Sequence, residues 1–340
     1  MRAMLLERAA PVEQGPLRAR DRPEPRPAGG EVSIEVEACG VCRTDLHIAE
    51  GEVSARLPVV PGHQVAGRVL ECGAGVEGLS PGELVGVGWL SSTCGECAFC
   101  LSNRENLCRL ACFTGRDRDG GYAERMTAPE RAVYRLPQGF TARQAAPLLC
   151  AGVIGYRTLR LSGARGGGKL GLFGFGASAH LVMQLARHEG CDVFVFTREQ
   201  RHRKLAIEMG AVWAGAPEDD PGVLLHAAAS FAPAGEIIPL ALARLDRGGT
   251  LAVNAIHMNP IPSFPYERLY GERAVRSVTN FTRRDALEFL ELAGRIPVRA
   301  ELEEFPLRAA NEALVKVKRG EIRGAAVLTI RDERLVEADE

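Results

Sequence analysis

Apolar and polar positions follow two different patterns along the chain. In the first part, apolar residues alternate with polar ones or form short runs between Gly- and Pro-rich turns, which predicts strands at Gly30 to Val36 and Val65 to Leu70. After Leu148 the spacing predicts helices that alternate with short buried strands. The predicted helices are Gly155 to Leu161, Ala179 to His188, Arg201 to Met209 and Arg284 to Ala293, and the predicted strands are Lys169 to Phe173, Asp192 to Phe196, Leu251 to Ile256 and Ala325 to Ile330. This alternation predicts an α/β fold in which a β-rich first part precedes a doubly wound parallel sheet.

The length of the chain indicates more than one domain. Its 340 residues suit two domains of roughly 100–200 residues each, and 46% apolar with 25% charged residues is the balance of an ordinary globular protein. Because the sequence contains no long linker and no repeat, we expect the two domains to pack closely. The cleft between them is where we expect the function to reside.

The charge balance disfavours large polyanionic partners. There are 42 Lys+Arg against 43 Asp+Glu residues, and the formal net charge of -1 offers no global field for nucleic acid or an anionic membrane. No apolar run approaches the roughly eighteen residues of a membrane span, and the opening MRAMLLERAAP lacks the apolar stretch of a secretory signal. We therefore expect a cytoplasmic protein, in which the ten cysteines are available as metal ligands or nucleophiles.

Four cysteines lie close together in the segment TCGECAFCLSNRENLC. Cys94, Cys97, Cys100 and Cys108 can wrap one ion with little loop-closure cost, which predicts a metal site. Four sulfur ligands fill the tetrahedral shell of zinc, so the predicted role is structural. An iron–sulfur cluster is an alternative, although the fourth cysteine follows late and no proline succeeds it. Four unliganded thiols are a further alternative, but free cysteines rarely cluster in this way.

A second group of metal-binding residue types is dispersed along the chain. Cys42 lies in CGVCRTDLH, His63 in PGHQVAGRV and Cys150 in APLLCAGVIGY. These three residues could meet in the cleft as ligands of one ion. Taken alone, a single histidine and two distant cysteines are more often packed in a core than bound to a metal.

The segment GLFGFGASAH follows a predicted strand and opens a predicted helix. Gly174, Gly176 and Ala179 complete a G-x-G-x-x-A pattern. In this pattern the first glycine permits a tight turn, the second lets the backbone approach a pyrophosphate, and the small third residue lets the helix pack closely on the strand. The context favours a dinucleotide site over glycines that merely turn the chain.

The end of the next predicted strand, FVFTREQRHRK, concerns the choice of cofactor. Thr197 stands where an NAD site usually has an acid, and Arg198 begins a cation-rich segment suited to a 2′-phosphate. This pattern favours NADP(H) over NAD(H). A basic, solvated helix start is the alternative, because Glu199 is adjacent and could itself bind the ribose hydroxyls.

These motifs together resemble the medium-chain zinc-dependent alcohol dehydrogenases over nearly the whole chain, up to the GEIRG segment at Gly320 to Gly324. The resemblance implies a GroES-like catalytic domain at 1–151, which carries both zinc sites. It further implies a Rossmann dinucleotide-binding domain at 152–277 and a return of the chain to the catalytic domain at 278–340.

The same resemblance assigns the metal ligands. It implies that Cys42, His63 and Cys150 hold a catalytic zinc whose fourth position is open to water or substrate. The four-cysteine group lies where the family carries its structural zinc. Asp45 is implied as the carboxylate that orients the His63 ring, although such an acid could equally be a solvated loop residue.

Four further residues match positions with known roles in the family. Thr44 matches the hydroxyl that bonds the alcohol oxygen, and His47 matches the proton acceptor nearer solvent. Arg43 matches a residue that reaches the cofactor pyrophosphate, and Trp89 resembles the bulky residue that narrows the substrate pocket in relatives acting on small alcohols. Each has an ordinary alternative as a turn, surface or packing residue.

Two positions depart from the family pattern. Gln64 stands where the family usually has glutamate, and losing a negative charge near the ion should leave the zinc more electrophilic. Ala325 stands where relatives usually carry a phosphate-binding arginine, whereas Arg323 lies two residues earlier. The contacts that hold the cofactor are therefore expected to differ.

From these residues and the resemblance, we predict a zinc-dependent oxidoreductase that transfers hydride between a small primary alcohol and NAD(P)+ and reduces aldehydes in the reverse direction. The resemblance implies two zinc ions per chain and a homodimer or homotetramer. A polyol or secondary-alcohol dehydrogenase of the same fold is one alternative. A non-catalytic zinc-ribbon protein with a binding or regulatory role is the other.

Overall fold

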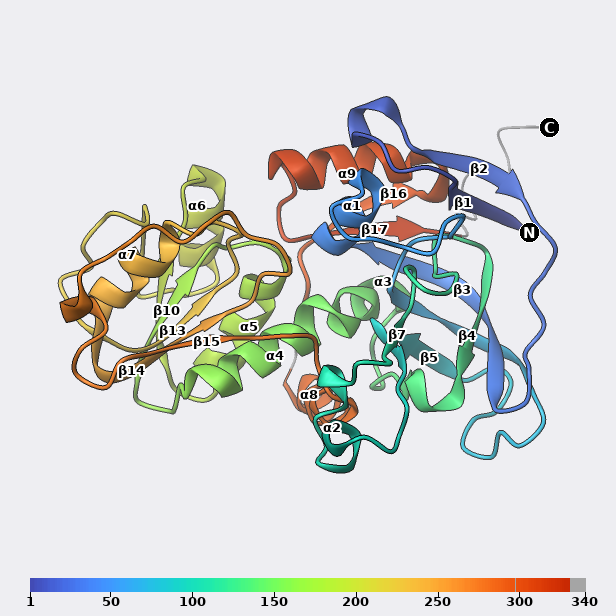
Figure 1. The fold of residues 1–340 in the computed structure, drawn as a ribbon, viewed down its shortest axis with the longest axis horizontal. Coiled ribbons are helices and arrows are strands. Elements are labelled where there is room, and N and C mark those ends of the chain that lie inside the picture. Colours follow the sequence, from blue (N-terminus) through green and yellow to red (C-terminus); the bar gives the residue numbers. More distant parts are fainter. Residues whose placement is uncertain (297, 331–340) are drawn as a thin grey trace. The chain divides into compact units, whose positions relative to one another are not determined.

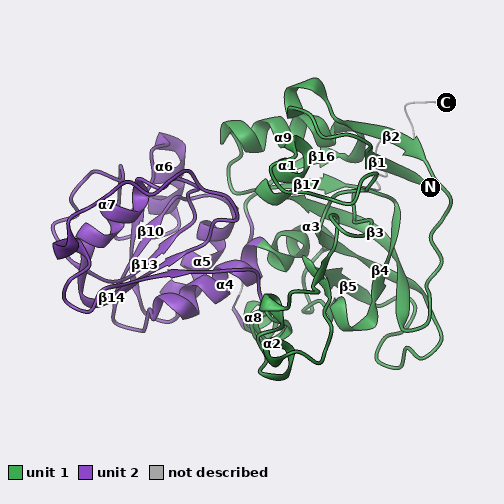
Figure 2. Ribbon diagram, in the orientation of Figure 1, with its two compact units in different colours: residues 1–150, 282–294, 301–340 green, residues 151–281, 295–300 purple. Residues whose placement is uncertain are grey.

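The structure is a computed structural model that describes residues 1–296 and 298–330. The chain forms two compact units, shown in different colours in Figure 2. Unit 1 contains Met1–Cys150, Thr282–Gly294 and the described residues from Glu301 onward. Unit 2 contains Ala151–Phe281 and Arg295–Ala300.

Unit 2 is built around a sheet of six parallel strands (Figure 1). In chain order these strands are β10 Lys169–Phe173, β11 Asp192–Phe196, β12 Trp213–Gly215, β13 Leu225–Ser230, β14 Leu245–Val253 and β15 Ala274–Ser277. Their order in space is β12-β11-β10-β13-β14-β15, and all neighbouring pairs are parallel. This is the strand order of a doubly wound dinucleotide-binding sheet, whose topological switch point lies between β10 and β13.

Helices cover both faces of this sheet. They are α4 Ala151–Ser162, α5 Ala177–His188, α6 Gln200–Glu208 and α7 Ile237–Arg244. Leu251 of β14 packs in a buried cluster with Ile238 and Leu242 of α7, whereas the next residue, Ala252, packs with Ile154 of α4. Because successive side chains of a strand point to opposite faces, α7 and α4 lie on opposite sides of the sheet.

Unit 1 contains a sheet of seven strands. They are β3 Glu31–Val41, β4 Gln64–Cys72, β5 Leu84–Val87, β8 Arg125–Pro129, β9 Val133–Arg135, β16 Leu302–Pro306 and β17 Ala325–Thr329. The order is β16-β17-β3-β4-β5-β9, with β8 paired to β3, and only β16 and β17 run parallel. Residues from both ends of the chain therefore share one sheet.

Shorter elements surround this sheet. Strands β1 Arg2–Leu6 and β2 Leu17–Asp21 pair with each other, as do β6 Leu90–Ser92 and β7 Cys112–Phe113. The α-helices are α1 Arg43–Glu50, α2 Ala98–Leu101, α3 Ala142–Ala145, α8 Arg283–Arg295 and α9 Ala310–Arg319. The 3₁₀ turns of unit 1 are η1 Val12–Gln14, η2 Glu105–Leu107, η3 Glu130–Ala132, η4 Ala146–Leu149 and η6 Leu307–Ala309, whereas η5 Tyr266–Arg268 belongs to unit 2.

The predicted doubly wound sheet is confirmed, and β10 and β11 have the predicted bounds. Helix α5 begins at Ala177, two residues before the predicted start, because Gly176 is its N-cap. The strand predicted to run to Ile256 ends instead at Val253. Its partner β13 ends at Ser230, and the register between the two strands ends at the pair Ser230 and Val253.

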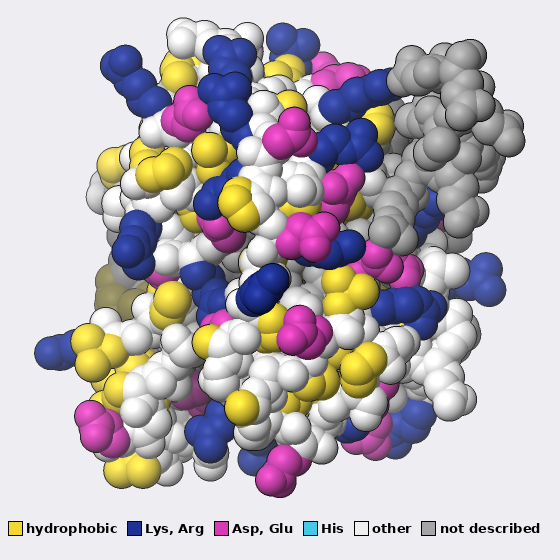
Figure 3. Space-filling model, turned by 90° about the vertical axis from the view of Figure 1, so that its right-hand side faces the viewer, with side chains coloured by type: hydrophobic (Ala, Val, Ile, Leu, Met, Phe, Trp, Pro, Cys, Tyr) yellow, Lys and Arg dark blue, Asp and Glu magenta, His cyan; other side chains and the backbone are white. Residues whose placement is uncertain are grey.

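The surface of the structure carries charges of both signs. On the face shown in Figure 3, basic and acidic side chains are interspersed, in keeping with the formal net charge of -1. Among the described helices, none combines the length and the apolar character needed to cross a membrane.

Candidate metal and dinucleotide sites

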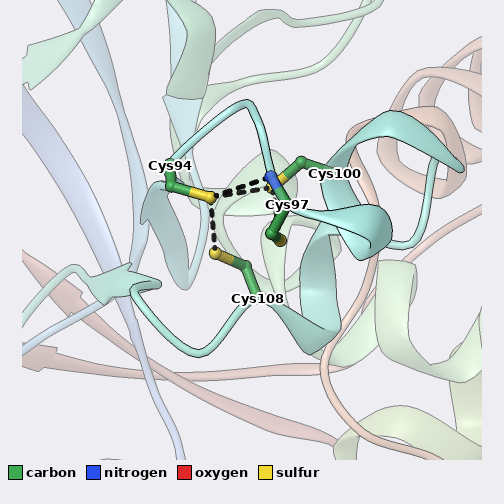
Figure 4. A group of neighbouring side chains, drawn as sticks. All are labelled: Cys94, Cys97, Cys100 and Cys108. Carbon is green, nitrogen blue, oxygen red and sulfur yellow. Dashed lines mark hydrogen bonds between the residues drawn. The ribbon is translucent and has the colours of Figure 1, made fainter.

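The four cysteines between residues 94 and 108 point toward one another in unit 1 (Figure 4). Cys97 is the N-cap of α2, Cys100 lies within α2, and Cys108 follows η2. The Sγ–Sγ distances are 3.8 Å from Cys94 to Cys100, 3.6 Å from Cys97 to Cys100 and 3.6 Å from Cys108 to Cys94. A tetrahedron with zinc–sulfur bonds of about 2.3 Å has edges of about 3.8 Å, so the sulfur atoms fit one zinc ion.

The backbone prepares the first of these sulfurs for a metal. The N–H groups of Glu96 and Cys97 lower the pKa of the Cys94 thiol to about 6. The second of these contacts, from Cys97 N to Cys94 Sγ, is 3.4 Å long and is drawn in Figure 4. Since metals bind the thiolate form, this local field favours a loaded site.

Three residues far apart in the sequence converge on a second site in unit 1. Cys42 is the N-cap of α1, His63 immediately precedes β4, and Cys150 follows η4. The two sulfurs and a ring nitrogen of His63 all lie within 4.8 Å of one another. Cys42 and Cys150 are partly buried and His63 is fully buried. The structure thus brings together the three residues that the sequence analysis proposed as one ligand set.

Asp45 joins these segments from within α1. Its Oδ1 accepts hydrogen bonds from His63 Nδ1 at 2.9 Å and Gly62 N at 3.3 Å. Its Oδ2 accepts from Cys42 N at 2.9 Å and from the hydroxyl of Tyr122 at 3.3 Å. The carboxylate is fully buried, so it is not the solvated loop acid that the sequence left open. Tyr122 was not predicted, because nothing in the local sequence links it to a residue 77 positions away.

The second ring nitrogen of His63 is a candidate donor to a metal ion. Nε2 is buried and has no hydrogen-bond partner in the described part of the chain, which is costly for a polar atom in an apolar surrounding. A metal ion ligated by Nε2 would remove that cost. The bond from Nδ1 to Asp45 fixes the ring in the orientation that a ligating histidine needs.

The charges in this site favour a cation. The Cys150 thiol, and then the His63 ring, lower the pKa of Cys42 well below its usual range. Burial opposes a charged ring at His63, but Asp45 and Cys42 outweigh it and raise the pKa of His63 to about 10. Burial, followed by the charge of Asp45, raises the pKa of Tyr122 well above its usual range, so its hydroxyl stays protonated. The donor set of two sulfurs and one imidazole is the chemistry that zinc binds.

Trp89 lies beside this ligand set. Its ring meets the ring of His63 edge-on at a centroid distance of 4.8 Å and stacks on Phe113 at 4.9 Å. Trp89 is 9% exposed. The residue proposed to narrow the substrate pocket is therefore in direct contact with His63, one of the three candidate ligands.

The two residues proposed to carry a proton lie on α1. Thr44 is half-buried, and its backbone N–H donates to Cys42 Sγ at 3.5 Å. His47 is buried, and its Nδ1 contacts Oε2 of Glu52 just beyond the end of α1. The side chain of Glu52 is 42% exposed, so it connects the buried imidazole to solvent. Glu52 was not predicted to take part, although the sequence has an acid five residues after His47.

The glycine-rich loop of unit 2 lies at the carboxyl end of β10. Gly174 has φ +87°, a conformation that favours glycine, and a Cβ there would lie 3.1 Å from the backbone N of Ala232. A Cβ on Gly176 would meet nothing within 4 Å, so this glycine leaves open space at the N-terminus of α5. Ala179 is fully buried within α5. Gly176 is therefore not required by close packing, and the helix N-terminus beside it is a candidate site for a pyrophosphate.

Thr197 and Arg198 follow β11 at the same edge of the sheet. Thr197 is buried, and its carbonyl accepts from Arg203 Nε at 2.8 Å, while the carbonyl of Arg198 accepts from Arg203 Nη2 at 2.8 Å. The guanidinium of Arg198 is exposed and pairs with Glu236 at 3.1 Å. Glu236, which the sequence analysis missed, is held in turn by Asn259. Arg203 therefore fixes the turn, and Arg198 is exposed at its surface, as are Arg201 and Lys204 in the helix that follows.

Comparisons with known proteins decide the family. Residues 28–138 match the family model described as the alcohol dehydrogenase GroES-like domain. The chain is 45% identical over 337 residues to a probable alcohol dehydrogenase, AdhA, of Mycobacterium tuberculosis, and the match covers 97% of each chain. The chain belongs to the medium-chain alcohol dehydrogenase family.

Further relatives agree with this assignment. An alcohol dehydrogenase of Geobacillus stearothermophilus is 35% identical over 93% of this chain and 96% of its own. Among solved structures, a cinnamyl alcohol dehydrogenase of Sorghum bicolor superposes with a TM-score of 0.89 at 27% identity, covering 96% of this chain and 97% of that one. The chain is an alcohol oxidoreductase, and the predicted combination of a GroES-like domain and a Rossmann sheet is confirmed.

Three further residues that were compared with the family pattern, and Arg323 beside one of them, have the following surroundings. Gln64 is buried at the start of β4, and its side chain packs over Gly40, where a Cβ would lie 2.9 Å from Gln64 Cδ. Ala325 is buried at the start of β17, and Arg323 is exposed, with its backbone N–H donating to Glu303. Arg43 is exposed on the first turn of α1.

Proposed function

We propose that the chain is a zinc-dependent alcohol dehydrogenase that transfers hydride between a small primary alcohol and NAD(P)+, and reduces the aldehyde in the reverse direction. One observation carries this proposal. Cys42, His63 and Cys150 direct two sulfurs and a ring nitrogen to within 4.8 Å of one another, and the His63 Nε2 has no partner in the described structure. Three donors leave one position of a tetrahedral zinc ion for the substrate oxygen.

Zinc, when bound, would supply a Lewis acid for the alcohol oxygen, and bound nicotinamide would accept the hydride. The protein has to remove the hydroxyl proton. In the proposed route the Thr44 hydroxyl accepts that proton as it gives its own to the imidazole of His47, whose Nδ1 contacts Glu52. Glu52 stabilises the resulting imidazolium and, being partly exposed, passes the proton to solvent.

The proposed substrate is small because Trp89 reduces the space beside the ligand set. Its ring, stacked on Phe113 and packed edge-on against His63, cannot move aside without breaking both contacts. A short primary alcohol fits this restriction better than a secondary polyol, whose additional hydroxyls also need polar partners. A panel of ethanol-like, benzylic and polyol substrates distinguishes the two classes by kcat/KM.

The proposed cofactor is NADP(H) rather than NAD(H). Thr197 has no carboxylate with which to accept the ribose hydroxyls, and Arg198 presents an exposed guanidinium at the same edge. We expect Arg198→Ala to raise the Kd for NADP(H) about tenfold and to leave that for NAD(H) nearly unchanged, since one charge-assisted contact is lost. Glu236→Gln is the matched variant, because it frees Arg198 and should lower the Kd for NADP(H). Equal effects on both cofactors would contradict the assignment.

We propose that the enzyme works as a homodimer or homotetramer. Strand β15 is the edge of the parallel sheet, and all four of its residues are exposed. Apolar side chains are exposed on the same strand and in the segment before it, at Val275, Tyr266, Tyr270 and Ile261. An unprotected edge with apolar neighbours is typical of a surface that a second copy covers. Light scattering of the purified enzyme tests this proposal.

A cytoplasmic location is proposed on the state of the cysteines. All ten are free thiols, and the two candidate metal sites require seven of them in the reduced form. A reducing compartment maintains that state. Comparing the enzyme in cytosolic and membrane or secreted fractions tests the location.

Metal analysis combined with a hydride-transfer assay tests the proposed function. The proposal requires two zinc ions per chain, one of which is lost together with activity on Cys42→Ser. A zinc-ribbon protein without catalysis would bind zinc and cofactor but show no change of nicotinamide absorbance with any alcohol. Hydride transfer that does not require zinc would also contradict the proposal.

A further inference from the structure

The carboxylate of Asp45 has one hydrogen-bond donor that the ligand segments do not supply. Three of its donors, Cys42 N, Gly62 N and His63 Nδ1, belong to metal ligands or their neighbour. The fourth is the hydroxyl of Tyr122, which donates to Oδ2 at 3.3 Å. We propose that Tyr122 is a positioning residue for the zinc site. The hydroxyl and the ring of Tyr122 together fix Asp45 and the Gly62–His63 backbone. This inference rests on the proposed zinc site.

The ring of Tyr122 packs against the segment that carries His63. Gly62 has φ +96°, and a Cβ at this position would lie 2.3 Å from Tyr122 Cδ1. No side chain fits between the two residues, so the tyrosine ring lies directly on the peptide that precedes the ligand. Tyr122 is fully buried and is among the largest buried side chains of the described residues.

Backbone hydrogen bonds hold the tyrosine in this place. Tyr122 N donates to Pro61 O at 3.0 Å, and Gly121 N donates to Gly62 O at 2.9 Å. On its other side, Met4 N donates to Tyr122 O at 2.8 Å. The segment at 120–122 therefore runs beside the segment at 60–62 and cannot shift without moving His63.

These contacts give the hydroxyl a defined task. Asp45 must hold one oxygen toward His63 Nδ1 and the other toward Cys42 N, which fixes the rotation of the carboxylate about its bond to Cβ. The Tyr122 hydroxyl is a further donor on the Cys42 side and disfavours other rotations. Without it, the carboxylate is less constrained, and the His63 ring is directed less sharply at the metal.

The test uses the full zinc-loaded enzyme and the variant Tyr122→Phe, which keeps the ring on Gly62 and removes only the hydroxyl. The rate of zinc release to a chromogenic chelator is the readout, and the phase belonging to the Cys42 site is the one missing in Cys42→Ser. We expect this phase to become about tenfold faster in Tyr122→Phe, because partners of ligating residues commonly contribute 10–100-fold in metal affinity. The release phase of the four-cysteine site should not change.

Tyr134→Phe is the matched control. Tyr134 is also a buried tyrosine of unit 1, and its ring packs against Arg283, so this variant removes a buried hydroxyl that makes no contact with Asp45. We expect it to change neither release phase. An unchanged Cys42-site phase in Tyr122→Phe overturns the proposal. Equal acceleration of both phases overturns it as well, because that result indicates general loosening of the unit.

A double-mutant cycle tests whether Tyr122 acts through Asp45. In the Asp45→Asn background the carboxamide has one acceptor oxygen instead of two, so removing the hydroxyl should change the Cys42-site phase less than about twofold. A full tenfold acceleration of zinc release in that background would show that Tyr122 does not act through Asp45. The visible spectrum of the cobalt-substituted enzyme is the second readout, and it should change in Tyr122→Phe but not in Tyr134→Phe.

Failure of the proposed function can be distinguished from failure of this inference. If the wild-type enzyme binds one zinc, and Cys42→Ser leaves both the zinc content and the release curve unchanged, the open zinc site itself is wrong. If the wild-type enzyme binds two and releases them in separable phases, the site stands, and only the response of Tyr122→Phe decides the role of the tyrosine.

Discussion

The two sulfur-rich sites of unit 1 differ in how many donors they offer and in where those donors come from. The first takes four sulfurs from residues 94–108, which all lie within 4.8 Å of one another and of which three pairs are 3.6–3.8 Å apart. The second takes two sulfurs and one nitrogen from residues 42, 63 and 150. Four donors close a tetrahedral shell, whereas three leave one place open. In the proposed function, this difference in donor count gives the first site a structural role and the second a catalytic one.

The two sites also differ in how far residues outside the ligand set hold the ligands in place. The four-cysteine site needs only its own short loop, in which backbone N–H groups lower the pKa of Cys94. The open site depends on a buried carboxylate, Asp45, whose donors come from the N-cap of its own helix and from two other segments, at His63 and Tyr122. A site that must keep one position free cannot rely on its ligands alone for its geometry. It needs partners that fix the ligands from outside.

Removing a ligand of the open site is expected to have the largest effect on activity. We expect Cys42→Ser to lower kcat/KM by about 1,000-fold or more, because the Lewis acid that stabilises the reacting oxygen is lost. The fold should persist, since β3 and β4 pair without the metal. Steady-state kinetics and circular dichroism check both statements, and activity within tenfold of wild type would refute the assignment.

The proton route belongs only to the open site and gives the next largest effect. His47→Gln should lower kcat by about 100-fold near neutral pH, because the general base is lost. The deficit should shrink as pH rises, since hydroxide can then accept the proton directly. A pH profile of kcat checks this. Glu52→Gln is the companion variant, for which we expect a smaller loss, and a deficit that does not depend on pH would argue against proton transfer at His47.

Loosening the open site without removing a ligand should have an intermediate effect. Asp45→Asn keeps the shape of the side chain but offers the His63 ring and Cys42 N a carboxamide in place of two carboxylate oxygens. We expect about a tenfold loss of zinc affinity at this site, at the lower end of the range for partners of ligating residues. Competition with a chelator measures it. Unchanged affinity would show that the carboxylate has no influence on the metal.

The four-cysteine site should give the smallest effect on catalysis and the clearest effect on stability. We expect Cys100→Ser to lower the thermal midpoint by about 5 °C or more, because metal binding at a structural site contributes to folding. Measured well below that midpoint, kcat should stay within about threefold of wild type, since this site offers no open position. Calorimetry and kinetics check the two parts. A loss of activity as large as that of Cys42→Ser would abolish the distinction.

The sequence predicted local features well, because they depend on neighbouring residues. The bounds of β10 and β11 follow from short apolar runs between turns. The cluster from Cys94 to Cys108 follows from its spacing, since a short loop can only bring its sulfurs together. The predicted end of β14 was wrong, because the strand ends where its neighbour β13 ends and not where its own apolar residues end.

Features that depend on distant pairs were found only through the resemblance or not at all. Spacing says nothing about the meeting of Cys42, His63 and Cys150, and only the family likeness suggested it. Tyr122 lies 77 residues from Asp45, and Glu236 lies 38 residues from Arg198. Both contacts arise from strand pairing and loop placement, which apolar periodicity does not encode.

Anomalous diffraction at the zinc edge, from crystals of the purified enzyme, tests the central claim most directly. We predict two peaks per chain. The second should lie about 2.3 Å from the sulfurs of Cys42 and Cys150 and about 2.0–2.1 Å from Nε2 of His63, with no protein atom as the fourth ligand. A single peak at the four-cysteine site, or a second peak whose fourth ligand is a protein side chain, would contradict the account.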